Sequence, residues 1–96
     1  DVLVYKDNDD FFANKTAIIA TGSLRRRAQW LYRYPNHKIT DLRGNINTRL
    51  QKLKDNDWDA AIFALAGLKR IKLLPKNNLK LDWMIPAPAQ GAVMIA

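Results

Sequence analysis

The sequence contains no cysteine, no glutamate and only one histidine, His37. Disulfides, thiolate metal sites, a cysteine nucleophile and a histidine-based metal cluster are therefore excluded, and we expect no metal. The longest apolar run, residues 60–68, has nine residues, about half of the ~18–20 that a membrane-spanning helix needs. No charged-then-apolar leader opens the chain. We expect a soluble, cytoplasmic protein that contacts no membrane.

Positive charge is abundant and unevenly distributed. Sixteen Lys and Arg residues stand against nine acidic ones, which gives a net charge of +7. Between residues 21 and 54 there are nine basic residues and one acid, Asp41. Such a concentration of one charge predicts a polyanionic partner.

The length and the two ends bear on domain organisation. Ninety-six residues with 48% hydrophobic content suffice for one compact domain, so we expect residues 1–96 to form a single domain. Natural domains usually end in polar residues, yet this chain starts directly in the apolar run 2–5 and stops in the apolar run 92–96. We therefore interpret it as a segment excised from a longer polypeptide.

Strand and helix patterns alternate along the chain. Strands are predicted at residues 16–20, 38–42, 59–64 and 80–85, with a rigid connector at 86–88 and extended structure at 92–95. One helix is predicted after Ser23, ending before Pro35, a second after Asn45, and a short third at 66–71. This alternation is typical of a mostly parallel sheet covered by helices, in which ligands bind beyond the carboxyl ends of the strands.

Five arginines fall at that carboxyl edge, in or beside the first turn of a helix or shortly after a strand: Arg25, Arg26, Arg43, Arg49 and Arg70. An arginine at a helix N-terminus costs roughly 0.3–1 kcal/mol, because that end already carries partial positive charge. Binding of an anionic ligand would explain why arginines occupy these unfavourable positions, and guanidinium groups match the geometry of carboxylate and phosphate. Each arginine alone could be a solvated surface charge, but together they predict an anion site.

Other polar and aromatic residues have ordinary structural interpretations. Ser23 is expected to cap the first helix, where its hydroxyl could also touch a ligand. Arg27, Arg33 and the lysines are expected to be surface residues, His37 a loop residue, and the three tryptophans core residues. Gly67 is expected to relieve a tight strand-to-helix turn, or to let a ligand approach the backbone. No residue stands out as a general acid or base.

Four motifs resemble, in order and spacing, the second domain of the porphobilinogen deaminase (hydroxymethylbilane synthase) family: TGSLRRRAQ at 21–29, LRGNINTRL at 42–50, AGLKR at 66–70 and PAPAQGA at 86–92. The resemblance implies a three-layer αβα sandwich similar to type II periplasmic binding proteins. It also implies part of a transferase of tetrapyrrole and haem biosynthesis. Members of that family join four porphobilinogen units, losing ammonia each time, on a covalently attached dipyrromethane cofactor.

The resemblance further implies which residues bind the carboxylates of cofactor and substrate: Thr21, Ser23, Arg25, Arg26, Arg43, Gly44, Arg49, Ala66, Gly67, Arg70 and Gln90. In that family the catalytic aspartate belongs to the first domain and the cofactor-bearing cysteine to the third. No catalytic residue is therefore expected in this chain, which should be inactive alone. Its expected partners are those two domains of the same monomeric polypeptide, porphobilinogen and the polypyrrole intermediates.

Two departures and two alternatives accompany the resemblance. Gly22 stands where the family commonly has a second serine, and Ala89 replaces a usual glycine. A basic nucleic-acid-binding module is one alternative, although aromatic residues are not interleaved with the basic stretch and no nucleic-acid-binding motif is present. A stand-alone domain that binds a small anion is the other.

Overall fold

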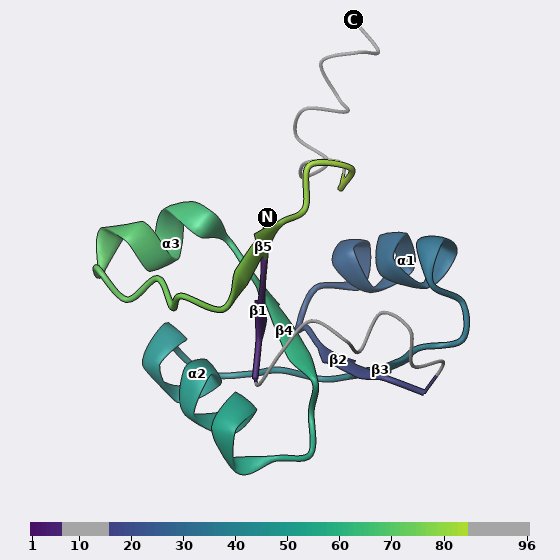
Figure 1. The fold of residues 1–96 in the computed structure, drawn as a ribbon, viewed down its shortest axis with the longest axis horizontal. Helices are drawn as coiled ribbons and strands as arrows, with labels where there is room; N and C mark the ends of the chain where they lie inside the picture. Colours follow the sequence, from purple (N-terminus) through teal and green to yellow (C-terminus); the bar gives the residue numbers. More distant parts are fainter. Residues whose placement is uncertain (7–15, 85–96) are drawn as a thin grey trace, which may run out of the picture.

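A computed structural model describes residues 1–6 and 16–84, which form one five-stranded sheet and three helices (Figure 1). The elements follow one another as β1 (Val2–Tyr5), β2 (Ile18–Ala20), α1 (Leu24–Arg33), β3 (Lys38–Thr40), α2 (Ile46–Asp55), β4 (Ala60–Phe63), α3 (Leu65–Arg70) and β5 (Asn78–Lys80). The order of strands across the sheet is β3-β2-β4-β1-β5. The α/β class expected from the alternating pattern is confirmed.

The sheet is mixed, so the prediction of a mostly parallel sheet is only half right. β2 pairs in parallel with β3 and with β4. β1 lies between β4 and β5 and runs antiparallel to both. Val2, Leu3 and Val4 of β1 are all buried, so the continuous apolar run in the sequence corresponds to a central strand covered on both faces. Such a run indicates burial on both faces but carries no information about strand direction.

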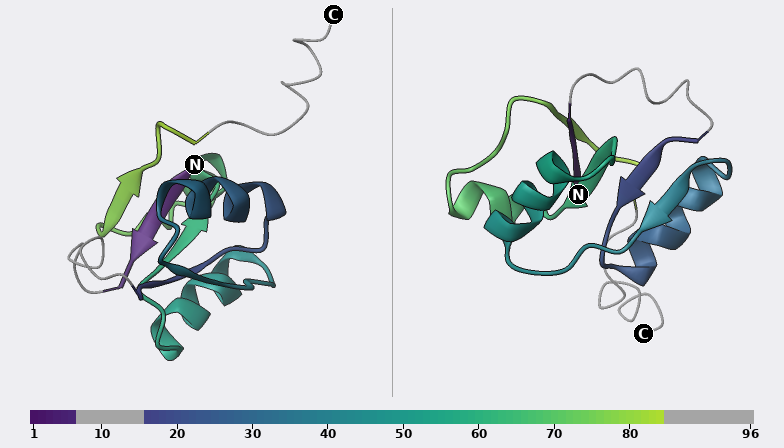
Figure 2. Two further views of the ribbon diagram at one scale, coloured as in Figure 1. Left: turned by 90° about the vertical axis from the view of Figure 1, so that its right-hand side faces the viewer. Right: turned by 90° about the horizontal axis from the view of Figure 1, so that it is seen from below.

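Helices pack against both faces of the sheet, as the views in Figure 2 show from two further sides. Alternate strand residues point to opposite faces, so Leu3, Ile19 and Ile62 join the core under α1. Val4 and Phe63 join a second core with residues of α2 and α3. The site-bearing helices are thus each anchored to the sheet by their own apolar cluster.

Both longer helices begin at the residues that the sequence predicts. The Ser23 hydroxyl accepts a hydrogen bond from the Arg26 backbone N–H at 3.2 Å, and the Asn45 side chain accepts one from the Thr48 N–H at 2.9 Å. These bonds satisfy donors that have no partner within the helix. The chain leaves α1 just before Pro35, which cannot continue a helix.

The predicted strand at 80–85 is wrong in its position. β5 occupies Asn78–Lys80, and the following residues form a turn in which the Met84 N–H donates to the Leu81 carbonyl at 3.1 Å. Leu81 and Met84 are both buried, so the apolar spacing reflects two anchors of a turn and not a strand. The connector at 86–88 and the extended segment at 92–95 lie outside the described residues.

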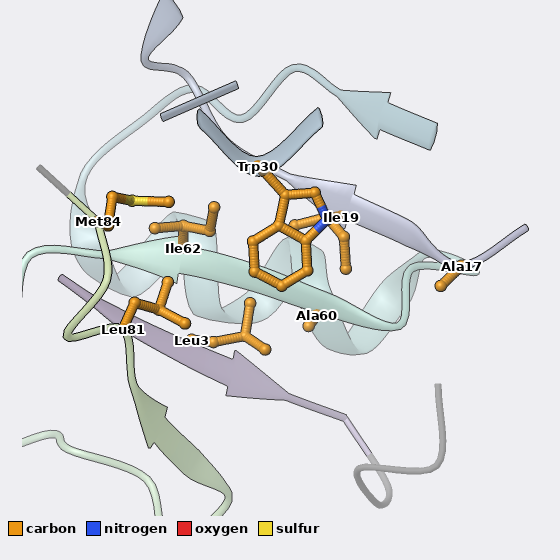
Figure 3. Packing of buried hydrophobic residues seen from close by; sticks show 8 residues of the cluster. All are labelled: Leu3, Ala17, Ile19, Trp30, Ala60, Ile62, Leu81 and Met84. Atoms are coloured by element: carbon orange, nitrogen blue, oxygen red, sulfur yellow. The ribbon is translucent and has the colours of Figure 1, made fainter. Parts of the chain in front are cut away.

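Trp30 is the centre of the core beneath α1, where it packs over Ile19 and Ile62 (Figure 3). Its indole N–H donates to Nδ1 of His37 at 3.1 Å, and both side chains are buried. His37 precedes β3 in a loop, as predicted, but it is a core residue and not a surface one. The partly buried Trp58 and Trp83 pack against the two cores, which confirms the core placement of the tryptophans. Within the described ranges, no helix is both long and apolar enough to cross a bilayer.

Candidate functional site

The candidate site is built on the loops that join β2 to α1 and β3 to α2. These loops are in close contact, because a Cβ at Gly22 would lie 2.4 Å from the Leu42 carbonyl oxygen. Thr21 is buried, and its backbone N–H donates to the Thr40 carbonyl at 3.0 Å. The Thr21 hydroxyl accepts a bond from the Ser23 N–H at 3.3 Å. A side chain at position 22 would therefore require the two loops to separate.

Arg25 and Arg26 both bind the carboxylate of Asp1. Arg25 Nη2 lies 3.3 Å from Asp1 Oδ2, and Arg26 Nη2 lies 3.0 Å from Asp1 Oδ1. Asp1 reaches them because β1 is antiparallel to β4: Val2 pairs with Phe63, so β1 begins at the edge where β4 ends. The exposed side-chain fractions are 21% for Arg25, 15% for Arg26 and 12% for Asp1.

Burial and mutual repulsion raise the energy of this pair of cations. Burial lowers the pKa of the Arg26 guanidinium, and burial followed by repulsion from Arg26 lowers the pKa of Arg25. Both stay protonated at neutral pH, because a guanidinium group does not lose its proton in proteins. The Arg26 Nε is buried and has no hydrogen-bond partner among the residues that the structure describes. Two cations and one carboxylate leave a net positive charge at the start of α1.

A hollow of about 150 Å³ lies at the ends of β2 and β3, and it is lined by Thr21, Gly22, Ser23, Leu24, Arg27, Ile39, Thr40, Asp41 and Arg43. Arg43 Nε contacts Asp41 Oδ2 at 2.8 Å, and both side chains are well exposed. Arg27, which the sequence pattern assigned to the ordinary surface, faces the same hollow. Arg27 follows the cap Ser23 by four residues, just as Arg49 follows the cap Asn45. The same spacing could therefore have placed Arg27 near the carboxyl edge.

Arg49 stabilises the loop before α2. Its Nε donates to the Gly44 carbonyl at 2.7 Å, and Gly44 has φ +108°, a conformation that favours glycine. Lys52 donates to the Arg43 carbonyl at 3.1 Å from the next turn of the same helix. Two cationic side chains thus hold the backbone of residues 43 and 44, which fixes the position from which the Arg43 side chain extends.

The residues of α3 are less closely associated with the arginine cluster. Ala66 and Arg70 are exposed, and Arg70 is the last residue of the helix. Gly67 lies inside α3 and not in the strand-to-helix turn where it was expected. A Cβ there would be 3.0 Å from Ile46 Cδ1, so the glycine allows α3 to pack closely against α2. Gln90 lies outside the described residues.

The contacts therefore separate the predicted residues into groups. Arg25 and Arg26 share one carboxylate, Arg43 and the unpredicted Arg27 share one hollow, and Arg49 binds its own loop. Within residues 1–6 and 16–84, no group of three or more His, Asp or Glu side chains is placed to hold a metal ion.

These features define the class of protein: an α/β domain whose strands β2, β3 and β4 end at an edge lined by guanidinium groups. The family model described as porphobilinogen deaminase, dipyromethane cofactor binding domain, matches residues 1–96. The chain belongs to the porphobilinogen deaminase family, as its four motifs predicted.

Several relatives carry that name. The porphobilinogen deaminase of Campylobacter hominis is 54% identical over 87 residues, covering 84% of this chain and 28% of that protein. The chloroplastic porphobilinogen deaminase of Oryza sativa is 48% identical over 82 residues, covering 83% and 23%. The probable porphobilinogen deaminase of Methanocaldococcus jannaschii is 42% identical over 98 residues, covering 100% and 33%. The chain thus spans 23–33% of the length of these relatives.

Proposed function

We propose that this chain is the second domain of a porphobilinogen deaminase, a transferase that joins four porphobilinogen units with loss of ammonia. Its edge arginines bind the acetate and propionate groups of the dipyrromethane cofactor and of the growing pyrrole chain. The two apolar cores on opposite faces of the sheet support a sandwich similar to type II periplasmic binding proteins. Family membership over the whole chain supports the reaction, and the arginine geometry supports the role within it.

One observation carries this role: Asp1 already lies between Arg25 and Arg26, with one carboxylate oxygen on each guanidinium. Two adjacent, largely buried cations at a helix start destabilise a domain unless something else requires them. Their geometry suits carboxylates, because each guanidinium presents several N–H donors in a planar fork. A polycarboxylate is therefore the ligand class that best explains their placement.

The donor set also fits the cofactor. The Arg26 Nε is a buried donor with no partner in the described part of the chain, and the hollow beside Arg43 combines another cation with the hydroxyls of Thr21 and Ser23. Arg25, Arg26 and Arg43 would hold carboxylates of the dipyrromethane and of the pyrrole units that are added to it. When bound, that group supplies the anchored pyrrole end to which further units are joined.

The chain's own contribution is positioning and electrostatic stabilisation of a polyanion. Fixed guanidinium groups cost no reorganisation when a negatively charged chain must be placed against catalytic groups. Those groups belong to the other two domains, which complete the site in the full-length polypeptide. The isolated 96-residue chain should accordingly form no hydroxymethylbilane from porphobilinogen, and turnover by it unaided would contradict this division of roles.

Substitution of single arginines in the full-length enzyme tests the binding role. We expect Arg26→Gln and Arg43→Gln each to raise KM for porphobilinogen about 10- to 100-fold, since a hydrogen bond between charged groups contributes about 1.5–3 kcal/mol. Arg26→Lys and Arg43→Lys should lose less, because they keep the charge without the planar fork.

The matched control is Arg33→Gln. Arg33 ends the same helix, but its guanidinium lies 4.9 Å from the ring centre of Trp83, away from the carboxyl edge. This variant removes the same charge and should leave KM within about twofold of the parent value. Equal effects at Arg33 and Arg43 would show that net charge, and not this site, binds the substrate.

A further inference from the structure

Asp1 is a member of the arginine cluster that the sequence pattern does not point to. Its two carboxylate oxygens are divided between Arg25 and Arg26, and its side chain is 12% exposed. Its backbone is fixed as well, because the Asp1 carbonyl accepts a bond from the Leu81 N–H at 3.0 Å. The next residue, Val2, is fully buried in β1. The carboxylate is thus attached to a rigid strand and cannot easily move away from the arginines.

The negative charge of Asp1 offsets the repulsion between Arg25 and Arg26. Successive helix residues point about 100° apart, so two adjacent guanidiniums converge only if something draws them together. Arg25 and Arg26 repel each other, and both are partly removed from solvent. A carboxylate between them offsets one of the two charges and orients both planar forks. The cluster keeps a net positive charge, which attracts an incoming carboxylate.

We propose that Asp1 is a positioning residue of the carboxylate site: it holds the Arg25 and Arg26 guanidiniums together in the orientation that binds a pyrrole carboxylate. This inference rests on the proposed function. It also excludes the opposite role, in which Asp1 would compete with the ligand for the same donors. Competition requires a carboxylate that can leave, whereas this one is anchored by β1 and by the bond from Leu81.

The test uses the full-length enzyme with porphobilinogen as the probe. Asp1→Asn removes the charge and leaves a single acceptor for two guanidiniums. We expect KM to rise about tenfold with kcat nearly unchanged, because the loss affects binding of ground state and transition state alike. Asp1→Glu keeps the charge one methylene further out and should recover part of the loss. The control Asp57→Asn removes the same charge from an exposed residue of the bend before β4 and should leave KM unchanged.

A double-variant comparison separates positioning from a general effect on folding. If Asp1 acts through the arginines, Asp1→Asn should raise KM less than about twofold in an enzyme that already carries Arg25→Gln and Arg26→Gln. A role in folding that does not depend on the two arginines would give the same further loss in both backgrounds, and a rise in KM with an unchanged unfolding midpoint separates positioning from stability. Should Asp1→Asn fail to fold, the comparison is made with Asp1→Glu, whose loss should likewise vanish in the double-arginine background.

Failure of the inference and failure of the proposed function give different results. If Arg26→Gln raises KM and Asp1→Asn does not, Asp1 is not a positioning residue and the arginine site stands. A lower KM for Asp1→Asn would show competition with the ligand and would also overturn the inference. If neither variant changes KM, the arginine site itself is wrong.

Discussion

Two aspartate–arginine contacts of similar length differ greatly in burial. Arg26 lies 3.0 Å from Asp1, with 15% and 12% of the two side chains exposed, whereas Arg43 lies 2.8 Å from Asp41, with 74% and 61% exposed. We predict that Asp1→Ala lowers the free energy of unfolding by about 2–4 kcal/mol, because it leaves two partly buried cations without a counter-charge. Asp41→Ala should cost less than about 1 kcal/mol, since water screens an exposed pair.

The magnitude for Asp1 follows from what the substitution removes. Breaking a fully buried pair by deleting one partner costs about 3–5 kcal/mol. Asp1, Arg25 and Arg26 retain some exposure and some freedom to turn toward water, so the expected loss lies below the top of that range. Asp1 screens the repulsion between the two arginines, so the loss in free energy of unfolding should stay well above that of an exposed ion pair.

Urea unfolding of the 96-residue chain, followed by tryptophan fluorescence, measures both losses. Trp30 is fully buried and reports directly on the core beneath α1. The denaturant slope should stay constant across the variants, so that a shift in midpoint reflects stability alone. Equal losses for Asp1→Ala and Asp41→Ala would contradict a dependence on burial, because contact length would then determine the energy.

Two further predictions concern the elements that carry the site. Ser23→Ala and Asn45→Ala should each lower the free energy of unfolding by about 1 kcal/mol through loss of a helix cap, and substitution to Gly should cost less; a loss below the error of urea titration would contradict the capping role. Trp30→Phe should cost about 1–3 kcal/mol, because it leaves Nδ1 of the buried His37 without its donor. Combining it with His37→Phe should give less than the sum of the two single losses, and strict additivity would show that the bond contributes nothing.

Local patterns predicted the helices well. Ser23 and Asn45 are caps whose residue types signal a helix start directly, and Pro35 signals an end. The same boundaries predict which arginines lie at helix starts, because those positions depend only on where each helix begins. Arg27 is exposed, as its surface assignment predicts, but it also lines the hollow, because β3 and the loop after it pack beside the start of α1.

Features that depend on distant parts of the chain could not be read from local patterns. The direction of β1 and its place between β4 and β5 follow from long-range pairing, which a buried apolar run does not specify. Asp1 meets Arg25 and Arg26 only because of that pairing. His37 is likewise buried by Trp30 and Tyr34 of the preceding helix region, although its own neighbours in sequence are polar.

The most direct test of the arginine site is an NMR titration that follows the arginine Nε–H resonances of the 96-residue chain. The ligands are a dipyrrole carrying free acetate and propionate groups, its methyl ester, and duplex DNA at two salt concentrations. We predict that the free acid shifts the resonances of Arg25, Arg26 and Arg43, that the ester shifts none of them, and that Arg33 stays unchanged. Shifts caused by DNA but not by the dipyrrole acid, or equal shifts with the acid and its ester, would contradict carboxylate binding at this edge.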